Sequence, residues 1–217
     1  MKSMKSIFKM MLVAFMAITS IAGVNAQEHS FWGVRLALDC TVPDWDGVKM
    51  SSGAGVSVAG VYNMYLHSDF IYIEPTAGFA YNTWAYKNTD DIEIDDMKFR
   101  GVNNSFRYFG LRTACPVGLS FHVMEHATLQ VFVGPEINFG FSNKFHVSAE
   151  NVSISESAYG SDGILERFNL SCTTGVSLRF DQHYQVGLSA SIPVTDIGKH
   201  DADYNNFRVA LTLGYNF

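Results

Sequence analysis

Phe207-Arg208-Val209-Ala210-Leu211-Thr212-Leu213-Gly214-Tyr215-Asn216-Phe217 closes the chain, and this stretch decides the fold. Every second residue from Phe207 to Phe217 is large and apolar, while the alternate positions hold Arg208, Asn216 and small side chains. Successive side chains of a strand point to opposite faces, so a period of two predicts a β-strand that separates two different environments.

The same period of two recurs along the chain, whereas helical spacing is nearly absent after residue 30. Eight segments carry it: residues 31–39, 53–64, 70–84, 106–121, 128–143, 168–180, 184–192 and 207–217. The expected fold class is therefore all-β, a closed antiparallel up-and-down transmembrane β-barrel of eight strands.

The links between these segments alternate in length. Short links cover residues 65–69, 122–127 and 181–183, and long polar links cover residues 40–52, 85–105, 144–166 and 194–205. Outer-membrane barrels have an even number of strands, short periplasmic turns and longer outer loops. Eight strands that start and end on the periplasmic side need three turns and four outer loops, which is the pattern here.

Three prolines lie within the expected strands: Pro75, Pro116 and Pro135. Proline cannot donate a hydrogen bond to a neighbouring strand, so each is expected to mark a bulge. If they broke the strands instead, the barrel would be open or closed with another strand number.

The composition of the polar face predicts which side lies inside. That face is mostly Gly, Ser, Thr, Asn and Ala, whereas a face in contact with water would be rich in Lys and Glu. Small residues suit the interior of an eight-stranded barrel, which is only just wide enough for side chains to fill it. The apolar rows are therefore expected to contact lipid. The alternative is a soluble secreted or periplasmic barrel that turns its apolar face inward and binds an apolar small molecule.

A few charges stand among the small residues of the polar face, about one on each of six strands: Arg35, Glu74, Arg112, Glu136, Arg179 and Arg208. Isolated charges in a low-dielectric interior are very costly, whereas Arg and Glu can satisfy each other. We expect a charge network that plugs the barrel interior. Four Arg against two Glu leave an imbalance that Asp39, backbone carbonyls or water would have to complete. The alternative is that these are surface charges of a soluble sheet.

Aromatic residues gather near the ends of the apolar rows, as head-group contact requires. The expected periplasmic belt contains Trp32, Tyr62, Phe121, Phe180, Tyr184, Tyr215 and Phe217. The expected outer belt contains Phe79, Tyr81, Phe109, Phe139, Phe141, Phe168 and Phe207.

The N-terminus has the pattern of a secretory signal. Lys2, Lys5 and Lys9 precede an apolar run over residues 10–24, and Ala26 ends a small-residue cleavage site. We expect residues 1–26 to be a cleaved signal peptide and residues 27–217 to form one outer-membrane β-barrel domain. The net charge of −6 becomes more acidic without the signal, which makes nucleic acid a poor partner.

Four stretches of the second half resemble a known family: Ala114-Cys115-Pro116-Val117-Gly118-Leu119, Val133-Gly134-Pro135-Glu136-Ile137, Pro193-Val194-Thr195-Asp196-Ile197-Gly198, and the ending Asn206 to Phe217. They are similar to the Bacteroidetes outer-membrane β-barrel family often labelled PorT-like. The resemblance covers residues 106–217 well and the first strands only by pattern. It implies an outer-membrane location and an eight-stranded barrel, and little about activity. The closing alternation also resembles the C-terminal signal that the barrel assembly machinery reads, with Tyr215 and Phe217 as its aromatic positions.

The residues that could carry chemistry all lie in the long links. An acidic run could form a weak cation site, although a solvated acidic loop is the plainer interpretation: Asp90, Asp91, Glu93, Asp95 and Asp96. His200, Asp201 and Asp203 could serve a hydrolase or acyltransferase, but no convincing partner serine accompanies them. We therefore expect no catalytic residues, no resident metal and no cofactor.

The sequence thus predicts a non-enzymatic integral protein of the cell outer membrane, with a plugged polar interior and four extracellular loops, in a structural or surface-binding role. Its expected partners are outer-membrane lipid and lipopolysaccharide, and the assembly machinery during biogenesis. The extracellular partner is not identified by the sequence.

Overall fold

The computed structural model describes residues 30–45, 50–66, 70–86, 92–94, 97–99, 103–149, 152–160, 163–199 and 204–217. Every regular element in these ranges is a β-strand. Across the same ranges, no helix has the length and apolar character needed to cross a membrane.

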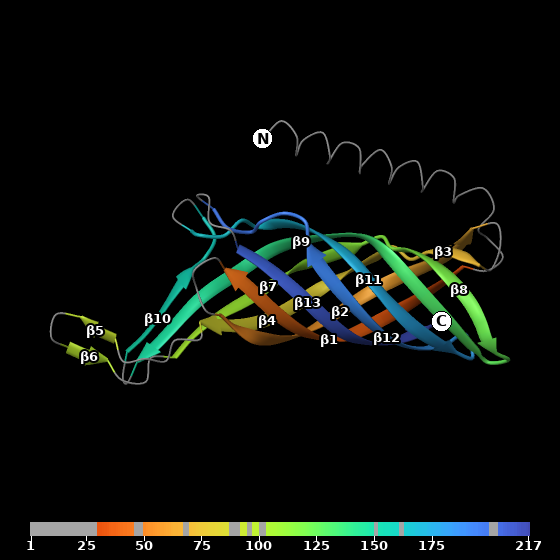
Figure 1. Cartoon of the computed structure of the whole chain (residues 1–217), viewed down its shortest axis with the longest axis horizontal. Helices are drawn as coiled ribbons and strands as arrows, with labels where there is room; N and C mark the ends of the chain where they lie inside the picture. The colour runs from red at the N-terminus through yellow and green to blue at the C-terminus, as the bar shows by residue number, and fades with distance from the viewer. Residues whose placement is uncertain are drawn as a thin grey trace, which may run out of the picture.

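The strands close into one barrel (Figure 1). They are β1 (Phe31–Trp45), β2 (Met50–Leu66), β3 (Ile71–Ile73), β4 (Thr76–Tyr86), β5 (Ile92–Ile94), β6 (Met97–Phe99), β7 (Asn103–Ala114), β8 (Val117–Met124), β9 (Ala127–Ala149), β10 (Val152–Ser157), β11 (Phe168–Phe180), β12 (Tyr184–Pro193) and β13 (Tyr204–Asn216). Around the ring, β1 pairs with β2, and the order continues through β4, β7, β9, β11, β12 and β13 back to β1. All of these pairings are antiparallel, so the predicted eight-stranded up-and-down barrel is confirmed.

Two strands of the ring consist of two pieces each. β3 and β4 are separated at Pro75, and β7 and β8 are separated at Pro116. Ile73 is opposite Val117 and Thr76 is opposite Ala114, so two residues on one strand face two on the other across the interruption. The register is therefore unchanged at these prolines, and each pair of pieces acts as one strand of the ring.

The three prolines keep one of the two hydrogen bonds expected at each position. The carbonyl of Pro75 accepts from the Tyr62 amide, that of Pro116 from Glu74, and that of Pro135 from Cys115, at 3.0–3.1 Å. Only the bond that the proline nitrogen would have donated is lost. The expectation that each proline marks a bulge is wrong, because one missing donor does not force an extra residue into the strand.

A bulge does occur between β7 and β9. Gly110 is opposite Gly140, whereas Phe109 is opposite Ser142, so β9 carries one extra residue at Phe141. The extra residue reverses the facing of the rest of β9, and Asn143 is consequently buried, with 2% of its surface exposed.

All four long links contain more strand than the sequence predicts, the last of them only at Tyr204 and Asn205, where β13 begins. β1 and β2 leave only residues 46–49 between them, so most of the expected link over residues 40–52 is strand. β9 runs on to Ala149 and folds back as β10, and β5 pairs with β6 inside the link over residues 85–105. β10 and the β5–β6 hairpin lie at one end of the barrel, while β3, β8 and the C-terminus lie at the other (Figure 1).

The apolar rows point outward. Leu38 and Leu213 are 61% and 53% exposed, whereas Asp39 and Asn216, each next to one of these rows, are 4% and 1% exposed. A soluble barrel would show the reverse, with the leucines around an internal cavity. The alternative of a soluble barrel that binds an apolar ligand is therefore wrong.

Outward aromatic side chains meet at both ends of the rows. Phe109 has its ring centroid 6.0 Å from that of Phe79 and 5.8 Å from that of Phe141. At the opposite end, Tyr215 is 5.5 Å from both Tyr184 and Phe217. The outward face thus carries aromatic groups at the two levels where a membrane has its interfaces.

Candidate functional site in the barrel lumen

Four charged side chains from four strands meet in the lumen. Arg112 Nη1 of β7 lies 3.0 Å from Asp39 Oδ2 of β1, and Arg208 Nη2 of β13 lies 2.6 Å from Glu136 Oε2 of β9. The other two sides are longer, with Arg112 Nε 4.0 Å from Glu136 Oε1 and Arg208 Nε 3.8 Å from Asp39 Oδ1. We call this ring of alternating charges the tetrad.

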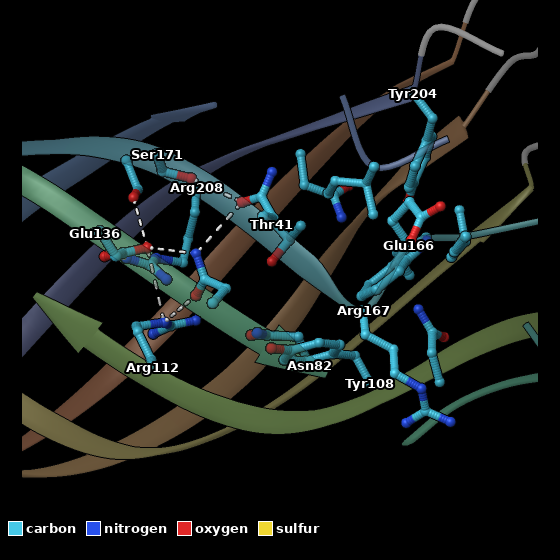
Figure 2. Close-up of a pocket in the computed structure, with 18 of the residues that line it drawn as sticks. Thr41, Asn82, Tyr108, Arg112, Glu136, Glu166, Arg167, Ser171, Tyr204 and Arg208 are labelled. Atoms are coloured by element: carbon cyan, nitrogen blue, oxygen red, sulfur yellow. Dashed lines mark hydrogen bonds and ion pairs between the residues drawn. The ribbon is translucent and has the colours of Figure 1, made fainter. Parts of the chain in front are cut away.

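The tetrad carries no net charge, since two guanidinium groups face two carboxylates. The Asp39 side chain is 0% exposed and that of Glu136 is 4% exposed. Carboxylates this deeply buried are tolerated only where partners replace the lost water. Ser191 and Asn138 supply two more hydrogen bonds to Glu136 Oε1, at 2.9 and 3.0 Å. Figure 2 shows the Glu136 carboxylate between Arg208 and Arg112.

A second ion pair lies elsewhere in the lumen. Arg35 Nη2 is 2.9 Å from Glu74 Oε2, and Asn63 donates to the same oxygen at 3.0 Å. The backbone makes room for the arginine: a Cβ on Gly214 would lie 2.7 Å from Arg35 Cδ. A side chain at position 214 would have to displace the Arg35 side chain.

Arg179 is held differently from the other predicted charges. Its Nη2 donates to the Tyr65 hydroxyl at 2.5 Å, and its guanidinium lies 5.1 Å from the ring centroid of Phe31 and 5.5 Å from that of Tyr65. Aromatic faces attract a guanidinium through their quadrupole. Of the six charges predicted to lie inside, the structure places Arg112, Glu136 and Arg208 in the tetrad, Arg35 and Glu74 in a separate pair, and Arg179 among rings.

Asp39 is the acid that the set of six omitted. Of the three ways to balance four Arg against two Glu, the structure shows this one, and Asp39 provides half of the negative charge of the tetrad. The sequence could have indicated this role, because Asp39 lies four residues after Arg35 and therefore on the same inward face of β1.

At the loop end of the lumen the filling changes from charges to rings. A cluster of buried side chains, the mouth cluster, consists of Trp84, Phe106, Ala158, Tyr159, Leu165 and Tyr204. The sequence predicts a plugged polar interior and does not predict this apolar layer. Trp84 lies two residues after Asn82 and therefore on the same inward face of β4. This spacing could have predicted that Trp84 points into the lumen.

Half of the mouth cluster comes from the segment 158–167, which follows β10 and of which the structure describes residues 158–160 and 163–167. Arg167 Nη1 donates to the carbonyls of Gly140 and Phe141 at 3.2 and 3.0 Å, and its guanidinium lies 4.9 Å from the Tyr159 ring centroid. Leu165 forms a bridge with Gly198. Burial raises the pKa of Tyr159 above its usual range, so its hydroxyl stays neutral. These contacts fix the segment against the inside of the barrel end.

Two cavities lie on either side of the tetrad, and Arg112, Glu136 and Arg208 line both. The outer cavity, of about 70 Å³, extends from the tetrad past the mouth cluster to the exposed residues Glu166 and Arg167 (Figure 2). The inner cavity, of about 130 Å³, extends past the Arg35–Glu74 pair. The tetrad is thus the shared wall of two polar chambers.

Most of the residues predicted for chemistry lie outside the described residues. Glu93 lies in β5, while Asp90, Asp91, Asp95 and Asp96 are outside the described residues. His200, Asp201 and Asp203 are outside them too. In the part of the chain that the structure describes, no three His, Cys, Asp or Glu side chains gather as metal ligands.

Comparison with protein families adds one decisive observation. A family described as "Outer membrane protein beta-barrel domain" matches residues 14–198. The chain belongs to this outer-membrane barrel family. Its apolar outer face therefore contacts the lipid of the outer membrane, and the predicted location is confirmed.

Solved structures similar to this barrel are small outer-membrane proteins. Ail, the attachment invasion locus protein of Yersinia pestis, shares 15% identity over 88% of this chain and 100% of that chain, with a TM-score of 0.46. OprG from Pseudomonas aeruginosa shares 10% identity over 87% and 95%, with a TM-score of 0.44. The outer-membrane enzyme PagL shares 12% identity over 85% and 98%, with a TM-score of 0.42. No curated protein matches the chain by comparison.

Proposed function

We propose that this protein is a non-enzymatic outer-membrane barrel whose lumen is closed to solutes and whose work is done at the extracellular surface. The observation that carries the proposal is the tetrad. Its four side chains reach inward from β1, β7, β9 and β13 and bond to one another across the space that a channel would need to keep open.

Three features support a closed lumen. The interior of an eight-stranded barrel has room for little beyond side chains. The tetrad separates two chambers rather than lining one continuous passage. The mouth cluster and the segment 158–167 add a second layer at the loop end. A barrel closed at two levels is suited to holding loops in place, not to transport.

The test is conductance in planar lipid bilayers. The purified, refolded barrel should give no large, stable channels. Large and persistent conductance from the wild-type protein would contradict the proposal.

A neutral double variant, Asp39→Ala with Arg112→Ala, sharpens this test because it removes half of the tetrad without leaving a net charge. It should raise ion leakage above the wild-type level. Ser57→Ala is the matched control, since it removes only a hydroxyl that accepts from Arg112 at 3.2 Å. The gel shift between boiled and unboiled samples verifies that each variant is folded.

We further propose how the chain reaches the membrane. Residues 1–26 would direct export and be cleaved after Ala26, and Tyr215 and Phe217 would be read by the assembly machinery. Both aromatic side chains lie on the outward face, at 40% and 72% exposure, where a second protein can contact them. Mass spectrometry of the mature N-terminus and outer-membrane levels of a Phe217→Ala variant test these two points.

We also propose that the chain belongs to the PorT-like family of Bacteroidetes. Its proposed partners are lipid, lipopolysaccharide and an extracellular molecule. The PorT-like stretches Cys115-Pro116 and Gly134-Pro135-Glu136 lie side by side, because the amide of Cys115 bonds to Pro135 at 3.1 Å. They therefore form one structural unit that includes the tetrad residue Glu136. Lipid and lipopolysaccharide would cover the outward face, and the extracellular loops would meet the unidentified partner.

A further inference from the structure

We propose that Arg107 and Lys144, which lie side by side on the outward face of the barrel, bind a phosphate group on the head group of an outer-leaflet lipid. The inference deepens the proposed function, because it assigns a site to the lipid partner, and it rests on that proposal for the orientation of the loop end. Lipid binding tests it, whereas conductance tests the closed lumen, so the two can fail independently.

The first observation is a pair of like charges on neighbouring strands. Arg107 of β7 is directly opposite Lys144 of β9, and both are exposed. Residues directly opposite each other in an antiparallel pair have Cβ atoms about 4.5–5.5 Å apart, and like charges at such positions are destabilising. Two cations in this arrangement are stabilised by an anion that lies between them.

Both side chains point away from the lumen. Phe106, which precedes Arg107, is 1% exposed, and Asn143, which precedes Lys144, is 2% exposed. Phe145, which follows Lys144, packs against the mouth cluster. Because successive side chains of a strand point to opposite faces, Arg107 and Lys144 lie on the face that meets lipid and head groups.

The second observation is that no carboxylate compensates the two charges. Among the described residues, no ion pair includes Arg107 or Lys144. Their cross-strand neighbours on the far sides are the neutral Thr83 and Ser157, whose hydroxyls donate to backbone carbonyls. Glu156, next to Ser157 on β10, lies on the other face of the sheet.

The composition of the chain makes this pair informative. The sequence has 21 Asp and Glu against 15 Lys and Arg, so an acidic neighbour is the more common choice along the chain. Two adjacent cations without an acid are therefore not a consequence of a basic composition. They form a local site of positive charge on an acidic protein.

The third observation is the level of the pair along the barrel. Two residues from Arg107 on the same face of β7, Phe109 is 42% exposed, and its ring meets those of Phe79 and Phe141. Aromatic residues of outer-membrane barrels lie at the membrane interfaces. Beyond these rings, on the loop side, Arg107 and Lys144 are the first charged residues on the outward face of β7 and β9. The pair thus lies at the depth of lipid head groups.

Phosphate is the head-group anion that suits these two side chains. A guanidinium presents a planar fork that bonds to two phosphate oxygens, and an ammonium is a compact charge with three donors. A phosphate between the two strands can accept from both. The acyl chains of the same lipid would cover the aromatic rings beside the pair, which a free phosphate ion would leave bare. These contacts favour a lipid over a soluble anion.

The experiment measures the binding of lipid A to the purified barrel. The barrel is refolded in lauryldimethylamine oxide, whose head group has no phosphate. It is titrated with lipid A, or with the same lipid A after its phosphates have been removed, and native mass spectrometry counts the bound lipid. We expect saturable binding of lipid A and roughly 10-fold weaker binding of the dephosphorylated form, the effect of losing two ion pairs.

Variants locate the binding. Arg107→Gln and Lys144→Gln should each weaken it about 2- to 5-fold, the range for one exposed ion pair. Lys199→Gln is the matched control, because it removes the same charge from a residue that lies on neither strand and bonds to the Gly160 carbonyl. It should leave the affinity unchanged. The gel shift again verifies folding.

Lys144→Glu separates lipid binding from a structural role. It places opposite charges at the two paired positions, so the barrel should unfold at a higher urea concentration than the wild type, yet bind lipid A more weakly. A variant that is less stable than the wild type would mean that Lys144 has a partner within the chain, and would overturn the inference.

Three results of the titration would also overturn it. They are equal binding of the dephosphorylated lipid, an affinity that Arg107→Gln and Lys144→Gln leave unaltered, and displacement of lipid A by millimolar inorganic phosphate. The last result would assign the pair to a soluble anion.

Discussion

The tetrad and the mouth cluster fill the same lumen by opposite means. The tetrad uses four charges from four strands, whereas the mouth cluster uses rings and a folded segment. The difference follows from what surrounds each level. At membrane depth an apolar side chain is as well placed in lipid as in the lumen, so polar groups that must avoid lipid decide what points inward. At the mouth, water lies outside, and the hydrophobic effect drives rings inside.

The largest expected effect comes from breaking the tetrad. Glu136→Gln leaves Arg112 and Arg208 with Asp39 as the one remaining acid of the tetrad. Removing one member of a buried ion pair costs about 3–5 kcal/mol, because it leaves an uncompensated charge. The free energy of unfolding, measured with urea in lipid vesicles, should fall by this amount.

The control for this variant is the neutral pair Glu136→Gln with Arg208→Gln. The double variant should lose less stability than the sum of the two single variants, since contacting residues are not additive. Additive losses would mean that Glu136 and Arg208 act independently, and the description of the tetrad as one unit would fail.

A smaller effect is expected at the mouth from Gly140→Ala. The added Cβ would lie 1.9 Å from the Tyr159 hydroxyl and 2.5 Å from its Cζ. Overpacking of this kind costs about 1–3 kcal/mol. The strands should hold while Tyr159 leaves the cluster, so chymotrypsin should cut the segment 158–167 faster than in the wild type.

Gly60→Ala is the matched control, because its Cβ would meet nothing nearer than the Ala77 carbonyl at 4.0 Å. Equal cleavage rates for the two glycine variants would show that Tyr159 does not depend on Gly140 for its place.

The smallest effect is expected from Arg167→Ala. The side chain is exposed, so its contact with the Tyr159 ring is worth about 0.5–1 kcal/mol, and its hydrogen bonds to the Gly140 and Phe141 carbonyls add little because water can replace the lost donor. Chymotryptic cleavage at Tyr159 should rise slightly, with no change in the unfolding of the barrel. Arg107→Ala, an exposed arginine on β7, should leave cleavage unaltered. If Arg167→Ala lowered barrel stability as much as Glu136→Gln does, the mouth cluster would contribute as much to the stability of the barrel as the tetrad.

The sequence predicts the parts of this molecule where two environments meet across one strand. Alternation is strict from Phe207 to Phe217 because one face contacts lipid and the other a narrow lumen. It fades toward the loop end, because on β1 the apolar Pro43 faces inward and the charged Asp44 outward, and on β9 the extra residue at Phe141 interrupts the alternation. The extensions of β1 to Trp45 and of β9 to Ala149 therefore escaped the pattern.

The site was predictable to the extent that it depends on charge. Arg112 and Glu136 stand out among small neighbours, but which acid meets which base depends on strand register and side-chain reach. The mouth cluster was not predicted, because an aromatic residue such as Trp84 fits a strand on either face. The segment 158–167 has no repeating pattern, and its position depends on contacts with Gly140 and Gly198 that are distant in sequence.

Because of the extra residue at Phe141, a chemical-labelling study that assumes strict alternation along β9 would assign the wrong facing to the residues that follow it. Counting alternate positions from Val131 would assign Lys144 to the inside and Asn143 to the lipid. Lys144 is in fact exposed and Asn143 is enclosed. A cysteine scan of this hairpin should therefore show its reactive positions change from odd to even numbers just past the aromatic residues, and deleting Phe141 should make the alternation continuous while Asn143 stays enclosed and Lys144 exposed.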